Sequence, residues 1–317
     1  MRALDELRGR LRRWLDPPVE VGLVCEIAAD YVSALRHHRG RVESWAIHPL
    51  PAGVVRPQPL GDNIVRASAV QEAVQHVIGT VADGRRQCVL LVPDLLARIV
   101  LLEFDHLPAR TEETERLLRW RLKKDLPFDV QQGVLSYRVQ AARENKREVI
   151  VAVCLRGLVR QYEECLEKVG LQPGWVGLST LASLGCLEGD SGAPRLLAKR
   201  DSASLSLALI HGSALRLFRS LPTARESSEQ SDKTLFEKLY PVLVYFADQC
   251  RQPVCEVVLA GPNGKQGGLT RQVEEEVGCG VRELTLEAFD VPLSPTSGSP
   301  PDYRLVPALG WARGEPA

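Results

Sequence analysis

Residue types that could perform catalysis or hold a metal are present, but their spacing completes no known motif. Gly264-Lys265-Gln266 looks like the end of a phosphate-binding P-loop, yet Leu259 stands where that motif needs glycine, and Gln266 replaces the required serine or threonine. Cys250 and Cys255 lack the second pair of ligands that a zinc site uses. No His-Glu-x-x-His or Gly-x-Ser-x-Gly segment occurs. We therefore expect neither a metal site nor a catalytic site of these classes.

The remaining histidine and cysteine signals favour structural roles. Cys25, Cys88 and Cys154 lie in apolar strand patterns, where cysteine usually acts as a small core residue. His37-His38 falls at a predicted hairpin turn, with no further ligands clustered nearby in the sequence. Function must therefore be sought elsewhere.

Composition excludes several other classes. The 317 residues carry 40 Lys+Arg and 40 Asp+Glu, so no net charge favours nucleic acid. No run of about eighteen apolar residues is present, so no membrane-spanning helix is expected. The N-terminus lacks the apolar block of a secretory signal. Because disulfides form mainly in exported proteins, we expect the 8 cysteines to be reduced thiols. These features predict a cytoplasmic protein.

Residues 1–18 form a separate unit, predicted as a basic amphipathic helix that Pro17 and Pro18 end. Its apolar positions recur at helical spacing, with Trp14 at their edge. Such a helix suits an anionic membrane surface or a partner helix, and a frayed, solvated terminus is the alternative. The membrane-surface candidates are Arg8, Arg12, Arg13 and Trp14.

The elements that would position a site follow a plan that occurs twice. Three short strands are predicted in residues 19–48, and three more in residues 196–220. Each copy ends on Leu-Pro, at Leu50-Pro51 and Leu221-Pro222. A repeat at this distance indicates two similar halves around a cleft. Between and after the copies, strands alternate with helices, which gives an α/β class.

Several further elements can be predicted individually. A helix face over residues 67–78 precedes a buried strand at Cys88–Val92, and a helix is expected from Thr111 to Lys124. The apolar run Val149–Leu155 is typical of a central strand. Residues 223–234 are polar and predicted to be a loop, after which a helix should begin at Leu235.

These pieces together resemble the PilM family of type IV pilus assembly proteins, which share the actin-like fold with FtsA. No single segment is specific, but their order and spacing are. The resemblance implies an actin-like (ribonuclease H-like) two-lobed fold, with the first lobe at residues 19–185, an inserted α+β subdomain at about 60–140, and the second lobe at 195–317. The segments that carry it are Val21-Gly22-Leu23, Pro49–Val54, Leu91-Val92-Pro93, Leu107-Pro108, Leu118-Arg119-Trp120, Leu126-Pro127-Phe128, Tyr137, Val149–Ala152, Val169–Pro173, Val258–Gly261 and Ala308–Ala312.

The resemblance also implies a nucleotide cleft, and the sequence departs from it at several positions. Actin-like ATPases place an Asp-x-Gly turn in each lobe. Here the first turn has Glu26 at the aspartate position and Ala28 at the glycine position. In the second turn, Lys199 replaces the aspartate and Asp201 replaces the glycine. The adenosine-side glycine pair is reduced to Gly261-Pro262, with Gly264 retained. A helical subdomain that closes the cleft in the family has no counterpart in residues 222–234, so it is missing or reduced. We expect a degenerate nucleotide site and no cofactor, with ATP and magnesium as the alternative.

A chain without that chemistry would act through its surfaces. The resemblance implies a scaffold that binds the cytoplasmic N-terminal peptide of a PilN-like inner-membrane protein, with indirect links to a PilO-like protein and the motor ATPases, peripheral to the inner membrane. In the family the peptide lies between the first lobe and the inserted subdomain. Trp120 and Phe128 are candidate anchors or core residues, with the core favoured for Trp120 beside Leu117 and Leu118. The full set of candidates is Leu107, Pro108, Trp120, Leu126, Pro127 and Phe128.

Two alternatives remain open. The chain could be an actin-like ATPase of the same machine that uses Glu26 with an unusual second turn. It could also correspond to the cytoplasmic domain of the type II secretion protein GspL, which normally continues into a transmembrane helix.

Overall fold

The structure is a computed structural model that describes residues 22–81, 84–140, 146–187, 192–223, 228–250, 252–262, 267–287, 289–294 and 298–314. The predicted N-terminal helix, with Arg8, Arg12, Arg13 and Trp14, lies outside the described residues, as does Gly264. Within the described residues, no helix is long and apolar enough to cross a membrane.

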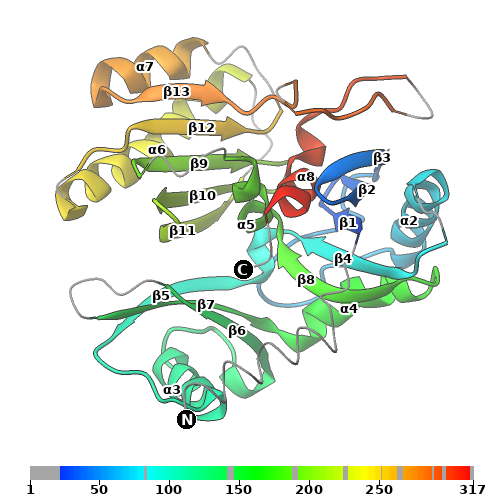
Figure 1. Ribbon diagram of the computed structural model, residues 1–317, viewed down its shortest axis with the longest axis horizontal. Helices are drawn as coiled ribbons and strands as arrows, with labels where there is room; N and C mark the ends of the chain where they lie inside the picture. Colours follow the sequence, from blue (N-terminus) through cyan, green and yellow to red (C-terminus); the bar gives the residue numbers. More distant parts are fainter. Residues whose placement is uncertain are drawn as a thin grey trace.

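Two five-stranded sheets of matching order form the two lobes (Figure 1). The first has the order β3-β2-β1-β4-β8 and the second β11-β10-β9-β12-β13. Each lobe begins with an antiparallel meander whose first strand then pairs in parallel with a later strand. The predicted duplication is therefore confirmed. The first sheet comprises β1 (Leu23–Ile27), β2 (Tyr31–His38), β3 (Arg41–Pro49), β4 (Gln87–Val92) and β8 (Gln172–Leu178). The second comprises β9 (Pro194–Arg200), β10 (Ser204–His211), β11 (Ala214–Pro222), β12 (Glu256–Ala260) and β13 (Gly280–Glu283).

A third sheet, β5-β7-β6, forms the inserted subdomain together with helix α3 (Thr111–Leu122). Its strands are β5 (Arg98–Phe104), β6 (Gly133–Val139) and β7 (Arg147–Leu155), and the short turn η2 (Val130–Gln132) precedes β6. The sheet thus spans residues 98–155, whereas α2 and β4, which fall within the expected insertion at 60–140, belong to the first lobe. The apolar run at Val149–Leu155 forms the central strand β7, as predicted.

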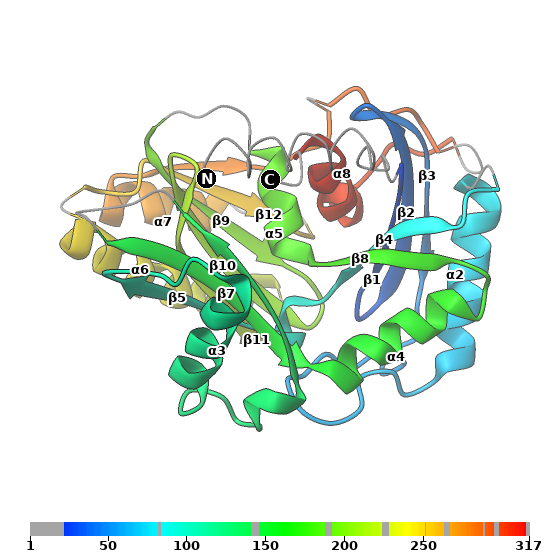
Figure 2. The same cartoon turned by 60° about the horizontal axis from the view of Figure 1, so that its bottom comes forward.

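Helices cover the outer faces of the lobes. In the first lobe, α2 (Ala67–Val81) packs on β2 and β3, beside α4 (Arg156–Glu167), which packs on β8 (Figure 2). In the second lobe, α6 (Ser228–Cys250) packs beside α7 (Gly267–Val277). Helix α6 begins at Ser228 rather than at Leu235, so the polar segment after residue 227 is helical and not a loop as predicted. Its apolar positions from Leu235 onward bury against the sheet, which stabilises the polar turns ahead of them.

One buried cluster extends across both lobes, and a second lies within the second lobe against α6 and α7. Leu197, Ala208 and Val258 of the second lobe belong to the same buried cluster as the strands of the first. The final helix α8 (Val306–Arg313), entered through η4 (Tyr303–Leu305), returns to the first lobe and crosses α5 (Ser179–Ser183) and η3 (Leu184–Cys186). This crossing is so close that a Cβ atom on Gly310 would lie 2.3 Å from the carbonyl oxygen of Ala182. Helix α8 is therefore packed tightly against the first lobe.

Candidate functional site

The space between the lobes is occupied by charged side chains that are almost fully buried. Strands β1 and β9 are the corresponding first strands of the two lobes, and Glu26 and Lys199 are their penultimate residues. Glu26 is 1% exposed and Lys199 is 5% exposed. Asp94, in the short turn η1 (Asp94–Leu96) after β4, is completely buried as well. Charges are rarely buried without partners, so the contacts of each are informative.

Glu26 accepts hydrogen bonds from two residues of its own lobe. The Tyr31 hydroxyl donates to Oε2 at 3.0 Å, and the Ser179 hydroxyl donates to Oε1 at 2.5 Å. Burial raises the pKa of Glu26 from 4.5 to about 7, against the opposing effects of the Lys199 charge and these two hydrogen bonds. Desolvation of the carboxylate is therefore the dominant influence at this position.

Asp94 is held in the same way by the N-terminal turn of α5. The backbone N–H of Thr180 donates to Oδ1 at 3.0 Å, and its hydroxyl donates to Oδ2 at 2.5 Å. Burial raises the pKa of Asp94, while the Lys199 charge and the hydrogen bonds from Thr180 and Ser206 oppose the rise. Because Ser206 lies on β10, the pKa of Asp94 is influenced from both lobes.

Lys199 and Asp201 form an ion pair within the second lobe, with 3.5 Å between Nζ and Oδ2. Burial by itself would lower the pKa of Lys199, but the charges of Asp201, Glu26 and Asp94 together raise it, so the ammonium stays protonated. Asp201 Oδ1 accepts the backbone N–H groups of Ala203 at 2.8 Å and Ser204 at 2.7 Å. Every charge in the cluster is thus matched by a side chain or backbone group of the chain itself.

The polar groups of the second turn between the lobes are occupied by the chain itself. The N–H groups of the second turn, which could bind phosphate, already bind Asp201. A Cβ atom at Gly261 would lie 2.7 Å from the carbonyl oxygen of Arg200, so this glycine accommodates the chain's own backbone. The buried Oδ1 of Asp30 has no hydrogen-bond partner among the described residues, but an acceptor atom repels phosphate. In the described part of the chain, no three His, Cys, Asp or Glu side chains converge as a metal site.

The covering wall of a nucleotide cleft is also small here. Strand β11 ends at Pro222 and α6 begins at Ser228, which leaves no room for a helical subdomain between them. Ala28, at the first turn, is itself buried and donates its N–H to the Tyr31 carbonyl at 2.9 Å.

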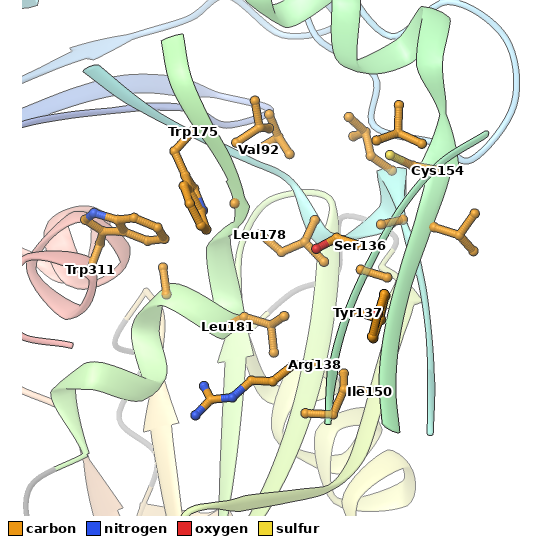
Figure 3. Close-up of a pocket in the computed structure, with 18 of the residues that line it drawn as sticks. Val92, Ser136, Tyr137, Arg138, Ile150, Cys154, Trp175, Leu178, Leu181 and Trp311 are labelled. Carbon is orange, nitrogen blue, oxygen red and sulfur yellow. The ribbon is translucent and has the colours of Figure 1, made fainter. Parts of the chain in front are cut away.

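A second candidate site is an apolar groove of about 1250 Å³ between the inserted subdomain, the first lobe and the β10–β11 turn. Val149, Val151 and Val153 of β7 pack toward α3, whereas Ile150, Ala152 and Cys154 face the groove. Across from them stand β8 and α5, which contribute Trp175, Leu178 and Leu181 (Figure 3). The groove is larger than the usual small-molecule site of about 300–1,000 Å³.

Two tryptophans mark one end of the groove. Trp175 on β8 is 55% exposed and its ring centroid lies 5.9 Å from that of Trp311 on α8, with the rings tilted by 53° (Figure 3). Exposed aromatic rings in a concave apolar surface are typical anchors of interfaces. Polar groups at the wall include Ser136 and Arg138 of β6, an edge strand that pairs only with β7 in the described sheet.

The inserted subdomain is fastened to the second lobe beside this groove. The Gln140 side chain donates to the carbonyl of Leu215 at 2.9 Å and accepts its N–H at 2.7 Å. Arg216 of β11 and Glu148 of β7 form an ion pair next to it. The groove walls are therefore held by three parts of the chain.

The residues predicted as peptide contacts lie elsewhere in the inserted subdomain. Leu107, Pro108, Leu126, Pro127 and Phe128 surround α3, and none of them lines the groove. Leu107, Leu126 and Phe128 pack on the core between α3 and the sheet. Trp120 is 72% exposed, so its expected place in the core is wrong. The buried stripe of α3 passes through Thr114, Leu118 and Leu122, at four-residue spacing, which turns Trp120 to the opposite face.

No family model matches the sequence, and no curated protein shows detectable sequence similarity. Solved structures do match. A structure described as the PilM-PilN type IV pilus biogenesis complex superposes with a TM-score of 0.72 and 19% identity, covering 92% of this chain and 97% of that one. The cytoplasmic domain of EpsL, an inner-membrane component of the Vibrio cholerae type II secretion system, gives 0.51 with 10% identity over 92% and 95%.

The ethanolamine utilization protein EutJ from Carboxydothermus hydrogenoformans gives a TM-score of 0.52 with 10% identity, covering 92% of this chain and 89% of that one. At these identities the similarity establishes the fold alone. The chain has the actin-like fold, with two lobes of mixed sheets, as the sequence predicted.

Proposed function

We propose that this chain is a scaffold of a filament-assembly machine of the type IV pilus kind, and that its apolar groove binds the cytoplasmic N-terminal peptide of a PilN-like inner-membrane protein. The observation that carries the proposal is the groove itself. Its size, its apolar floor and its exposed Trp175 suit several apolar side chains of an extended segment better than one small molecule. Similarity to a PilM-PilN complex supports the choice of partner.

The same proposal assigns the chain to the inner face of the inner membrane, without catalysis and without a nucleotide. It would act there by linking the membrane protein, and through it a PilO-like protein, to the motor ATPases. The self-satisfied cluster of Glu26, Asp94, Lys199 and Asp201 supports the nucleotide-free part. Similarity to the EpsL domain leaves a type II secretion machine as the second setting for the same scaffold role.

Titration calorimetry with a synthetic N-terminal peptide of the PilN-like protein from the same organism tests the proposal. We expect one peptide per chain with no nucleotide added. Trp175→Ala should weaken binding about 30-fold, since truncating a buried aromatic anchor costs about 2 kcal/mol or more. Trp120→Ala is the matched control, because this exposed tryptophan lies on α3 of the inserted subdomain and does not line the groove. Equal affinities of the two variants, or no binding by the wild-type protein, would refute peptide capture in this groove.

A further inference from the structure

We propose that the Lys199–Asp201 ion pair takes the place of the cation and the phosphate that a bound nucleotide would supply between the lobes. With no nucleotide bound, the charges of this pair hold the two lobes together. The inference rests on the nucleotide-free part of the proposed function and is independent of peptide capture. The inference has two parts, an internal anion and an internal cation.

The internal anion is the carboxylate of Asp201. Successive backbone N–H groups in a turn form a concave site that attracts anions. Here the N–H groups of Ala203 and Ser204 both point to Asp201 Oδ1, and the Ser204 hydroxyl lies 3.1 Å from Oδ2. The turn therefore binds its own side chain, which is 10% exposed, in the place where it would otherwise attract a phosphate oxygen.

The internal cation is the ammonium of Lys199. It pairs with Asp201 on its own lobe and is 5% exposed. The turn η1 and helix α5, which carry Asp94 and Ser179 of the first lobe, pack on β10, the strand that pairs with β9. The Lys199 charge therefore acts across the lobe boundary on Asp94 and Glu26. The carboxylates of the described residues do not converge closely enough to share a metal ion. An ammonium on a long side chain needs no such convergence, because its charge acts on each carboxylate over several ångströms in a poorly polarisable interior.

The cluster connects the lobes because its fixed parts belong to both. Tyr31 and Ser179 orient Glu26, and Thr180 orients Asp94, all within the first lobe. Lys199 comes from β9 of the second lobe, opposite Ser206 in the β9–β10 pairing. Removing the ammonium would leave buried carboxylates of the first lobe facing Asp201 without a counter-charge, which is strongly destabilising in an interior.

The test is a thermal double-mutant cycle at pH 8 on the full chain, with Lys199→Met, Glu26→Gln and the combined variant. We expect Lys199→Met to lower the Tm by about 5 °C or more. Glu26→Gln should raise the Tm more in the Lys199→Met background than in the wild type, because there it removes a negative charge that has lost its partner. The control cycle uses Lys146→Met and Glu103→Gln, a solvent-exposed pair with 3.4 Å between Nζ and Oε2, which should show little coupling. Millimolar Mg-ATP should leave the wild-type Tm unchanged.

Several results would overturn the inference. These are a Lys199→Met protein that melts within about 2 °C of wild type, additive effects in the main cycle, or a wild-type Tm that rises with Mg-ATP. If Lys199→Met yields no folded protein, Lys199→Arg, which keeps the charge, should fold and the combined variant should recover soluble protein. Equal failure of the Met, Arg and combined variants would mean that side-chain shape rather than charge holds the lobes. A wild type that binds peptide while failing this cycle would leave the scaffold proposal intact.

Discussion

The buried carboxyl of Glu26 gives the sharpest quantitative prediction. Its pKa is raised from 4.5 to about 7, mainly by burial. Between these two pH values the folded protein holds a proton that the unfolded chain has released, so the free energy of unfolding falls as the pH rises through this window. At about 1.36 kcal/mol per pKa unit, the loss attributable to Glu26 is about 3 kcal/mol.

Glu26→Gln removes this titration and retains an oxygen that can accept a hydrogen bond from Tyr31 or Ser179. The difference in unfolding free energy, variant minus wild type, should therefore rise by about 3 kcal/mol between pH 4.5 and pH 8. For a chain of this length that corresponds to about 5 °C in Tm. Denaturant unfolding followed by circular dichroism at several pH values measures it, and Glu275→Gln, on the exposed face of α7, is the control. A difference that stays flat with pH would refute the reasoning about burial.

Two further predictions concern packing and thiol reactivity. Gly310→Ala should destabilise the protein by about 3 kcal/mol, because the new Cβ atom would lie 2.3 Å from the Ala182 carbonyl oxygen. Gly79→Ala on α2 is the control: its Cβ atom meets nothing within 4 Å, so this variant should be neutral or more stable. Calorimetric unfolding compares the two variants, and equal stabilities would contradict the close helix crossing. Cys255 is exposed, and burial raises the pKa of Cys88 to about 12, so a thiol reagent at pH 8 should modify Cys255 in the native protein and Cys88 only after unfolding. Cys255→Ser should remove one rapidly reacting thiol, and unchanged rapid labelling would count against the burial pattern.

Much of the architecture could be predicted from the sequence because it depends on local signals. Alternating strands and the glycines at residues 40 and 212, both at positive φ, specify two meanders that form with the same topology. The sequence repeat also matches Glu26 of the first copy to Lys199 of the second. In the structure both residues lie at the penultimate position of their strands, β1 and β9. Helix α6 was predicted to begin too late, because its first turns have polar residues whose helical state depends on the apolar residues that follow.

The interior of the cleft and the groove required the fold. Asp94, Ser179 and Thr180 come from segments far from Glu26 in sequence, and nothing in their neighbourhoods indicates that they converge. The groove depends on the second face of β7, which a continuous apolar run does not distinguish from the first. Trp120 was misassigned from its apolar neighbours, although the four-residue spacing of Leu118 and Leu122 could have shown that it faces outward.

A crystal structure of the nucleotide-free protein with the PilN-like N-terminal peptide is the decisive test of both proposals. We expect an extended peptide in the groove, with apolar side chains between Trp175 and the Ile150 face of β7, and Lys199 still paired with Asp201 between closed lobes. A peptide seated on α3 around Trp120, or a complex that forms only when a nucleotide separates Lys199 from Asp201, would contradict this expectation.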